Sequence, residues 1–246
     1  MTAKTNALGQ PIGEPVPTWT DRRRPPRTPV RGHYCSVEPL EPRKHGRDLF
    51  DAAALDTQGA NWTYLPYGPF ATHQAYAGWM QMTCMGDDPQ FYAIVDCATG
   101  KATGVASFLR IESKGGVIEV GHINLSPLAQ RNRVGTEAMF LMMRRAFDEI
   151  AYRRYEWKCD ALNAPSRTAA ERLGFTFEGI FRQATVYKGR NRDTAWYSII
   201  DKEWLHLKRA FEAWLDPANF DAQGQQKSRL SELTAAALKA SRAPLR

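Results

Sequence analysis

The chain has 246 residues, of which 43% are hydrophobic and 24% charged, and its formal net charge is +7 at pH 7. This composition is typical of a globular protein and excludes a disordered, collagen-like or coiled-coil chain. Because no apolar run reaches the roughly 18 residues of a membrane span, and the start lacks the pattern of a secretion signal, we expect a cytoplasmic protein.

The positive charge is concentrated in residues 1–31, which hold six basic and two acidic side chains together with six prolines. This composition predicts an extended basic arm. Such an arm can contact RNA, although a solvated tail or an oligomer arm is the simpler interpretation. The four cysteines lie too far apart for a zinc or redox motif, so we expect free thiols and no metal site.

Strand-like and helical patterns alternate after the arm. In chain order we expect a strand at 33–40, a helix at 47–55, an aromatic loop at 61–70, a helix at 72–85, and strands at 91–96, 103–111 and 117–125. There follow a long helix at 133–150, a strand at 154–159, a helix at 163–173, strands at 175–181 and 194–201 around a polar turn at 188–193, and helices at 202–215 and 230–241. This order predicts a mixed α/β (α+β) fold with helices on the faces of a sheet.

The strongest chemical signal lies in residues 117–137, where a strand leads into a basic loop that opens the long helix. Exposed amides at a helix N-terminus bind anions with the help of the helix dipole. The side chains of Gln130, Arg131 and Arg133 crowd this point, and Gly135 lets a ligand approach the backbone closely. The junction predicts an anion site, although an ordinary helix start with a few arginines would look the same.

Four segments together identify a family. They are VIEVGHINLSP before the junction, Gln130-Arg131-Asn132-Arg133-Val134-Gly135 within it, NAPSRTAAERLGF at 163–175, and Arg192-Asp193-x-x-x-Tyr197. In this order they resemble the GNAT superfamily of acetyl-CoA-dependent N-acetyltransferases, in particular the branch of ribosomal-protein N-terminal acetyltransferases. The resemblance covers residues 30–203 and implies a mostly antiparallel sheet flanked by helices on both faces.

The resemblance also implies which residues bind acetyl-CoA. They are Ile123, Asn124, Leu125, Gln130, Arg131, Asn132, Arg133, Val134, Gly135, Thr136, Asn163 and Ser166. The loop amides would wrap the pyrophosphate, and N–H groups near residues 123–125 would hold the thioester carbonyl oxygen. Arg133 departs from the family pattern, because it replaces the first motif glycine. Its side chain is expected either to crowd the loop or to pair with a phosphate.

The implied reaction is direct attack of a neutral amine on acetyl-CoA in a ternary complex. Glu119 is the first candidate for the general base by its family position, and His122 is the second because its pKa suits proton transfer. Tyr197 is a candidate to protonate the leaving thiolate. Each residue also has a structural interpretation: a strand carboxylate, a sheet histidine and a core tyrosine.

Three aromatic side chains, Trp62, Tyr64 and Tyr67, lie in the loop that corresponds to the acceptor side of the family. They would line a pocket for an aliphatic or cationic amine, or plug the loop onto the sheet. The acceptor is either a protein N-terminus or a small-molecule amine. The alternatives are a non-catalytic module that binds coenzyme A, suggested by Arg133, and a nucleic-acid-associated protein, suggested by the basic arm.

The chain divides into the arm at residues 1–31, an acetyltransferase domain at 32–203 and a C-terminal helical extension at 204–246. The first helix of the extension carries an apolar stripe formed by Trp204, Leu207, Phe211 and Trp214. A stripe of this kind is covered either by a second subunit, as in a homodimer, or by the domain itself.

Overall fold

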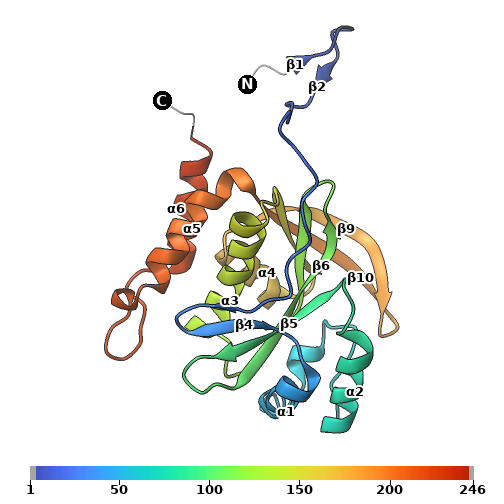
Figure 1. The fold of residues 1–246 in the computed structure, drawn as a ribbon, viewed down its shortest axis with the longest axis vertical. Helices are drawn as coiled ribbons and strands as arrows, with labels where there is room; N and C mark the ends of the chain where they lie inside the picture. Colours follow the sequence, from blue (N-terminus) through green and yellow to red (C-terminus); the bar gives the residue numbers. More distant parts are fainter. Residues whose placement is uncertain (1–3, 244–246) are drawn as a thin grey trace.

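An eight-stranded sheet organises residues 4–243, the part of the chain that the computed structural model describes (Figure 1). Its strands are β3 (Val30–Arg31), β4 (Cys35–Pro39), β5 (Gln90–Asp96), β6 (Ala102–Glu112), β7 (Val117–Leu125), β8 (Arg154–Asp160), β9 (Thr176–Tyr187) and β10 (Arg190–Ile200). The spatial order is β3-β4-β5-β6-β7-β8-β10-β9. Only β7 and β8 pair in parallel; the other neighbours are antiparallel, which confirms the predicted mixed, mostly antiparallel sheet.

The parallel pair is short. Residues 117–120 of β7 pair with residues 154–157 of β8, and within the described chain no pairing between these strands continues past them. From that point β7 stays with β6, while β8 stays with β10. The two central strands therefore separate toward their C-terminal ends, and one edge of each is left without a strand partner.

Helices cover both faces of the sheet. They are α1 (Pro42–Ala53), α2 (His73–Thr83), α3 (Arg133–Arg144), α4 (Ala164–Arg172), α5 (Asp201–Leu215) and α6 (Leu230–Ser241), with short helical turns η1 (Ala60–Trp62), η2 (Arg145–Glu149) and η3 (Pro217–Asn219). The alternation of β5 separates two apolar clusters: Tyr92 and Ile94 pack with α3 and α5, whereas Phe91 and Ala93 pack with α1 and α2.

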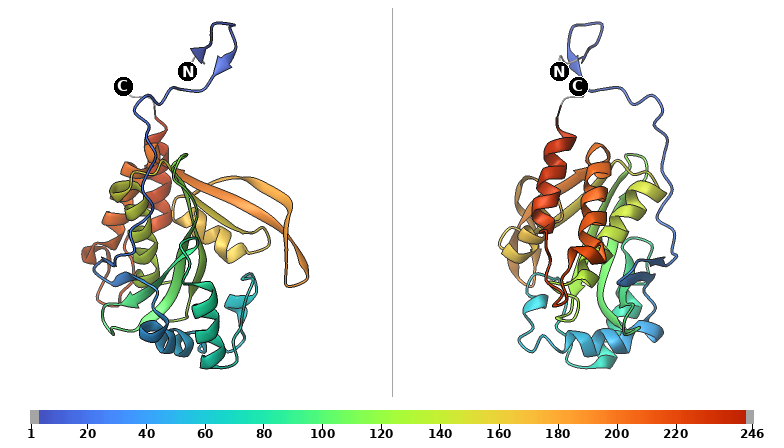
Figure 2. Two further views of the ribbon diagram at one scale, coloured as in Figure 1. Left: turned by 45° about the vertical axis from the view of Figure 1, so that its right-hand side comes forward. Right: turned by 90° about the vertical axis from the view of Figure 1, so that its left-hand side faces the viewer.

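The apolar stripe of α5 is buried within the chain. Trp204 stacks on Phe147 and packs against Phe140, and Phe211 stacks on Phe140, so that α5 lies against α3. Figure 2 shows α5 and α6 side by side on this face. The domain covers the stripe, which removes the sequence argument for a homodimer.

The N-terminal segment has two parts. A small hairpin of β1 (Lys4–Thr5) and β2 (Pro11–Ile12) stands away from the rest, whereas the residues that follow run down the domain to β3 (Figure 2). Arginines of this second part donate to the chain's own carbonyl oxygens: Arg22 to Ala151, Arg23 to Glu149, Arg24 to Asp87 and Arg27 to Gly86. Half of the basic arm is therefore docked on the protein.

Some element boundaries differ from those predicted. The first helix starts at Pro42 rather than at residue 47, because proline is favourable in the first helical turn. The long helix ends at Arg144 and continues as the π-helix η2. Residues 190–193, predicted as part of a turn, already belong to β10. No helix within residues 4–243 is long and apolar enough to cross a membrane, and these residues contain no cluster of three metal-ligating side chains.

Candidate active site

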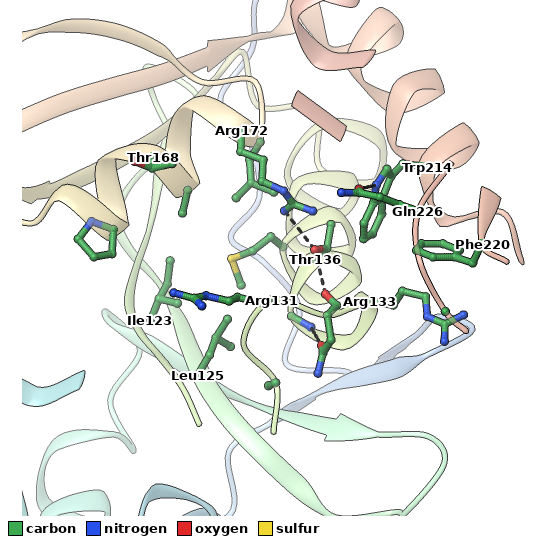
Figure 3. A pocket seen from close by; sticks show the side chains of 18 of the residues that line it. Ile123, Leu125, Arg131, Arg133, Thr136, Thr168, Arg172, Trp214, Phe220 and Gln226 are labelled. Atoms are coloured by element: carbon green, nitrogen blue, oxygen red, sulfur yellow. Dashed lines mark hydrogen bonds between the residues drawn. The ribbon is translucent and has the colours of Figure 1, made fainter. Parts of the chain in front are cut away.

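A cavity of about 960 Å³ opens where β7 and β8 separate (Figure 3). Its walls come from the end of β7, the loop that leads into α3, the exposed side of α4 and the chain after α5. Ile123 and Leu125 lie at one end of the cavity, and Trp214 and Phe220 lie at the other. The first turn of α3 lies between the two ends.

The N-terminus of α3 presents unbonded amides to this cavity. Asn132 caps the helix, and its side-chain oxygen accepts from the Gly135 N–H at 3.2 Å. No hydrogen bond in the described chain engages the backbone N–H groups of residues 131–134. Gly135 cannot be replaced easily, because a Cβ there would lie 2.4 Å from the Ala129 carbonyl oxygen. These features match the predicted anion site, and they fit a pyrophosphate.

Arg172 is a cavity residue that the sequence patterns did not indicate. Its Nη1 donates to Thr136 Oγ1 at 3.3 Å, and its guanidinium lies 5.1 Å from the centre of the Trp214 ring. No carboxylate within residues 4–243 forms an ion pair with it, and burial lowers the pKa of Arg172 below its ordinary value. A half-buried cation without an anion partner beside a helix N-terminus is suited to bind phosphate. The segment at 163–175 contains Arg172, but only the fold shows that this residue faces the cavity, because it brings α4 next to α3.

The Arg133 side chain does not crowd the loop. Its guanidinium turns away from the loop and lies 4.8 Å from the centre of the Tyr34 ring and 4.7 Å from that of Phe220. Arginine is tolerated in the place of the motif glycine because its guanidinium is held between two rings, at the end of the cavity that Phe220 lines.

The other residues predicted to bind the cofactor take varied positions. Arg131 lines the cavity, with its backbone in the left-handed region at φ 55°. The Gln130 side chain points instead to Asn61 and to the Leu125 carbonyl, and Asn124 is buried in the sheet. Val134 lies on the far side of the loop, beside Tyr34.

The polar side chains at the start of α4 are engaged within the protein. Asn163 caps α4 by accepting from the Ser166 N–H, and Ser166 Oγ accepts from the Trp157 indole at 3.0 Å. Neither residue lines the cavity, whereas their neighbours Ala164 and Pro165 do. Any contact that the ligand makes with α4 therefore involves its small and apolar residues.

Glu119 and His122 lie three residues apart on β7 in opposite environments. Glu119 is buried and accepts from Arg110 at 2.8 Å, while Lys158 lies 3.0 Å away; burial nevertheless raises its pKa. His122 packs between the Tyr67 and Phe91 rings, with its Nδ1 3.1 Å from the Tyr67 hydroxyl. Burial and nearby arginines lower the pKa of His122 to about 4, so the ring is neutral at physiological pH.

A family model for the acetyltransferase (GNAT) domain matches residues 39–176, more than half of the chain. The chain belongs to the GNAT acetyltransferases. A GCN5-related N-acetyltransferase from Brucella melitensis is 48% identical and superposes with a TM-score of 0.87, covering 89% of this chain and 100% of that one. A GNAT-family protein from Chromobacterium violaceum is 40% identical with a TM-score of 0.74, covering 79% of this chain and 97% of that one.

A more distant structure shares the fold alone. It is the microcin C7 self-immunity acetyltransferase MccE in complex with acetyl-CoA and AMP, which is 18% identical with a TM-score of 0.60 and covers 69% of this chain and 93% of that one. No protein of curated function matches the chain.

Within this GNAT domain, Tyr197 does not reach the cavity. The side chain is fully buried, and its hydroxyl accepts from Arg167 at 3.1 Å and donates to Glu171 at 3.2 Å. Tyr197 thus ties β10 to α4. This arrangement gives no support to the expectation that it protonates a leaving thiolate.

The aromatic loop packs around His122. Trp62 is buried, with Tyr67 and Phe70 edge-on to it, and the Tyr64 hydroxyl donates to the Leu162 carbonyl at 3.1 Å. The β9–β10 hairpin closes over this loop, where Lys188 Nζ donates to the carbonyls of Trp62 and Gly68. Of the three predicted acceptor residues, Tyr67 alone contacts a catalytic candidate, and Trp62 mainly fills the core.

Proposed function

We propose that the protein transfers an acetyl group from acetyl-CoA to an amine by direct attack in a ternary complex. The observation that carries this proposal is the cavity, which joins the gap between β7 and β8 to the free amides of α3 and to a cation without a carboxylate partner. Both partners of an amine acetylation can be held there at once, which supplies much of the acceleration by proximity.

The chain's residues divide the binding task. The amides of residues 131–134 and the guanidinium of Arg172 would bind the pyrophosphate. The unpaired edge of β7 near Ile123 and Leu125 would hold the pantetheine arm and the thioester carbonyl oxygen. When bound, acetyl-CoA supplies an acyl group activated as a thioester.

We infer that His122, rather than Glu119, accepts the amine proton, although a pKa lowered to about 4 makes its ring a weak base. Its ring is neutral at physiological pH, and no hydrogen bond in the described chain engages its Nε2. Glu119 is already neutralised by two cations, and proton uptake there would break both ion pairs. We therefore assign Glu119 the role of holding Arg110 and Lys158 beside the site.

Two features of the sequence suggested the alternative functions, a non-catalytic module that binds coenzyme A and a nucleic-acid-associated protein. In the structure, neither feature supports its alternative. Arg133 does not obstruct the loop, so it gives no reason for a module without turnover. The arginines of the basic arm engage the chain's own carbonyls, so fewer are free for RNA. Within the family, the sequence segments favour the ribosomal-protein branch and hence a protein N-terminus as acceptor.

Calorimetric titration of acetyl-CoA, followed by mass spectrometry of an acceptor panel, tests the proposal. The panel contains peptides with free N-termini, lysine side chains and small-molecule amines. We expect micromolar binding and acetylation of the peptides at the N-terminal amine. Arg172→Gln should weaken binding about tenfold, through the loss of a charge-assisted contact, while Arg209→Gln, an exposed arginine on α5, should not. Absence of acetyl-CoA binding would refute the proposal.

A further inference from the structure

The segment that follows α5 forms one whole end of the cavity. Its lining residues there are Trp214, Phe220, Gln223, Gly224, Gln225 and Gln226. Figure 3 shows Trp214, Gln226 and Phe220 at the end opposite Ile123 and Leu125, with Arg172 and Thr136 between. By sequence this segment looks like part of an extension, but in space it completes the site.

This wall is held in shape by its own hydrogen bonds. The Asp221 carboxylate accepts from the N–H groups of Gln223 and Gln225, at 3.0 and 2.8 Å. Asn219 accepts from the Ser228 N–H at 2.9 Å, and Phe220 forms an antiparallel bridge with Gln226. The wall is therefore formed before any ligand binds, so a ligand would bear little ordering cost.

Two contacts attach the wall to the core of the site. The Arg133 guanidinium lies between the rings of Phe220 and Tyr34, and the Tyr34 hydroxyl donates to the Leu215 carbonyl at 3.1 Å. The Trp214 indole donates to Gln226 Oε1 at 2.8 Å, which orients the side-chain amide group of Gln226 as a hydrogen-bond donor. The arginine that replaces the motif glycine thus links the first turn of α3 to the wall.

The chemistry of the wall suits a purine. It combines aromatic faces with side-chain amides, and adenine has apolar faces and an edge that carries both hydrogen-bond acceptors and an amino donor. The wall holds no acidic side chain among its cavity-lining residues. If the pyrophosphate lies at the start of α3 and the pantetheine arm points to β7, the remaining end of coenzyme A, its adenosine, faces this wall.

We propose that residues 214–226 form a binding site for the adenine base of coenzyme A, and that Arg133 is a positioning residue that holds this site through Phe220. The inference rests on the proposed function, because it takes the ligand of the cavity to be acetyl-CoA. It adds a base-binding contact that lies outside the family's sequence motif.

Fragment binding measured by calorimetry tests this site. The probes are coenzyme A, dephospho-coenzyme A, adenosine 3′,5′-bisphosphate and 4′-phosphopantetheine. Phe220→Ala should weaken coenzyme A, dephospho-coenzyme A and the bisphosphate about tenfold each and leave 4′-phosphopantetheine unchanged. Arg133→Gly should do the same more weakly, and Arg133→Lys should restore part of the affinity. Leu205→Ala, an exposed apolar position on α5 away from the cavity, is the matched control.

The outcomes separate the two proposals. If the unaltered protein binds none of the probes, the proposed function fails. If it binds coenzyme A but Phe220→Ala leaves every affinity unchanged, or weakens all four probes equally, the adenine site is refuted. If Phe220→Ala abolishes only the preference for coenzyme A over dephospho-coenzyme A, the wall binds the 3′-phosphate, and the assignment to the base is wrong. Unfolding temperatures of all variants identify a general loss of structure.

Discussion

Two residues of one strand illustrate how environment divides chemical roles. Glu119 and His122 both looked like bases in the sequence, yet the carboxylate is tied to Arg110 and Lys158, while the imidazole is kept neutral between aromatic rings. The difference follows from neighbours that lie far away in the chain, on β6, β8 and the aromatic loop. The sequence analysis ranked Glu119 first by its family position, whereas these environments favour the reverse order.

The kinetic prediction at this scale concerns His122. His122→Gln removes the group that we propose as acceptor of the amine proton, so kcat/KM should fall about 100-fold with little change in acetyl-CoA affinity. Steady-state kinetics and calorimetry on the same preparation measure both quantities. Tyr67→Phe, which keeps the stacked ring and removes only the hydroxyl, should lose far less. An unchanged kcat/KM in His122→Gln would exclude His122 as the base.

A second prediction follows from the low pKa of His122. Its pKa is about 4 in the folded protein, against an ordinary value of 6.5. The unfolded chain therefore binds a proton in this range that the folded protein does not. His122 therefore leaves the free energy of unfolding undiminished above about pH 6.5. As the pH falls toward 4, proton binding by the unfolded chain lowers that free energy by up to roughly 3 kcal/mol. Urea unfolding at pH 7 and pH 4.5 should show a smaller acid loss in His122→Gln than in His206→Gln.

At the scale of elements, a buried carboxylate joins the N-terminal strand to the helix of the site. Glu137 on α3 accepts from the backbone N–H groups of His33 at 2.8 Å, and of Tyr34 and Cys35 at 2.7 Å each. Gly32 leaves room for it, because a Cβ there would lie 2.4 Å from the carboxyl carbon. The start of β4 is therefore attached to the same helix turn that presents the anion site.

The substitution Glu137→Gln places a side-chain NH₂ group beside the three backbone N–H groups that donate to the carboxylate. We expect a loss of about 3 kcal/mol in the free energy of unfolding, since all three N–H groups lose a charged acceptor and at least one faces an NH₂ group. Urea denaturation monitored by circular dichroism measures it. Glu212→Gln, an exposed carboxylate on α5, controls for the change in charge. A loss equal to that of the control would mean that the three hydrogen bonds contribute no net stability.

The elements themselves were largely predictable where periodicity is local. The predicted bounds of β7 and α6 match the structure, and β7 follows a strand pattern that Ser126 and Pro127 end. The hairpin of β9 and β10 was predicted too short, because strand residues that lie over a neighbouring loop carry polar side chains such as Arg190 and Arg192. The π-helix after Arg144 has no sequence pattern of its own.

At the scale of the whole molecule, residues 18–29 of the N-terminal segment form a strap that is attached to the domain. Arg145 on η2 is buried, and its guanidinium donates to the carbonyls of Pro26 and Thr28, at 3.1 and 2.6 Å, and to Thr28 Oγ1. Among residues 4–243, the ion-pair partner of Arg145 is Glu149. The strap therefore supplies acceptors that the buried cation cannot find elsewhere.

Two deletions separate the strap from the hairpin. Removing residues 1–17 should leave the unfolding temperature unchanged, because the hairpin stands away from the domain. Removing residues 1–29 should lower it by about 10 °C, since Arg145 then keeps only its ion pair. Differential scanning calorimetry compares the two. Equal unfolding temperatures would show that the strap adds no stability.

In the site too, features formed by neighbouring residues could be predicted from the sequence, whereas those formed by residues far apart in the chain could not. The loop into α3 could be found from its motif, because backbone amides, a cap and a glycine lie within a few residues. Arg172 and the wall at residues 214–226 could not, because they enter the cavity from α4 and from beyond α5. The fold class followed from element order, while the completeness of the site depends on contacts that span most of the chain.

The wall that closes the cavity also has a consequence for synthesis. Trp214 and Phe220 complete a pocket whose other walls come from β7, α3 and α4. A nascent chain that has emerged only as far as α4 has the loop and its amides but lacks one end of the cavity. If residues 214–226 bind the coenzyme as we propose, tight binding begins only after translation has passed Gln226.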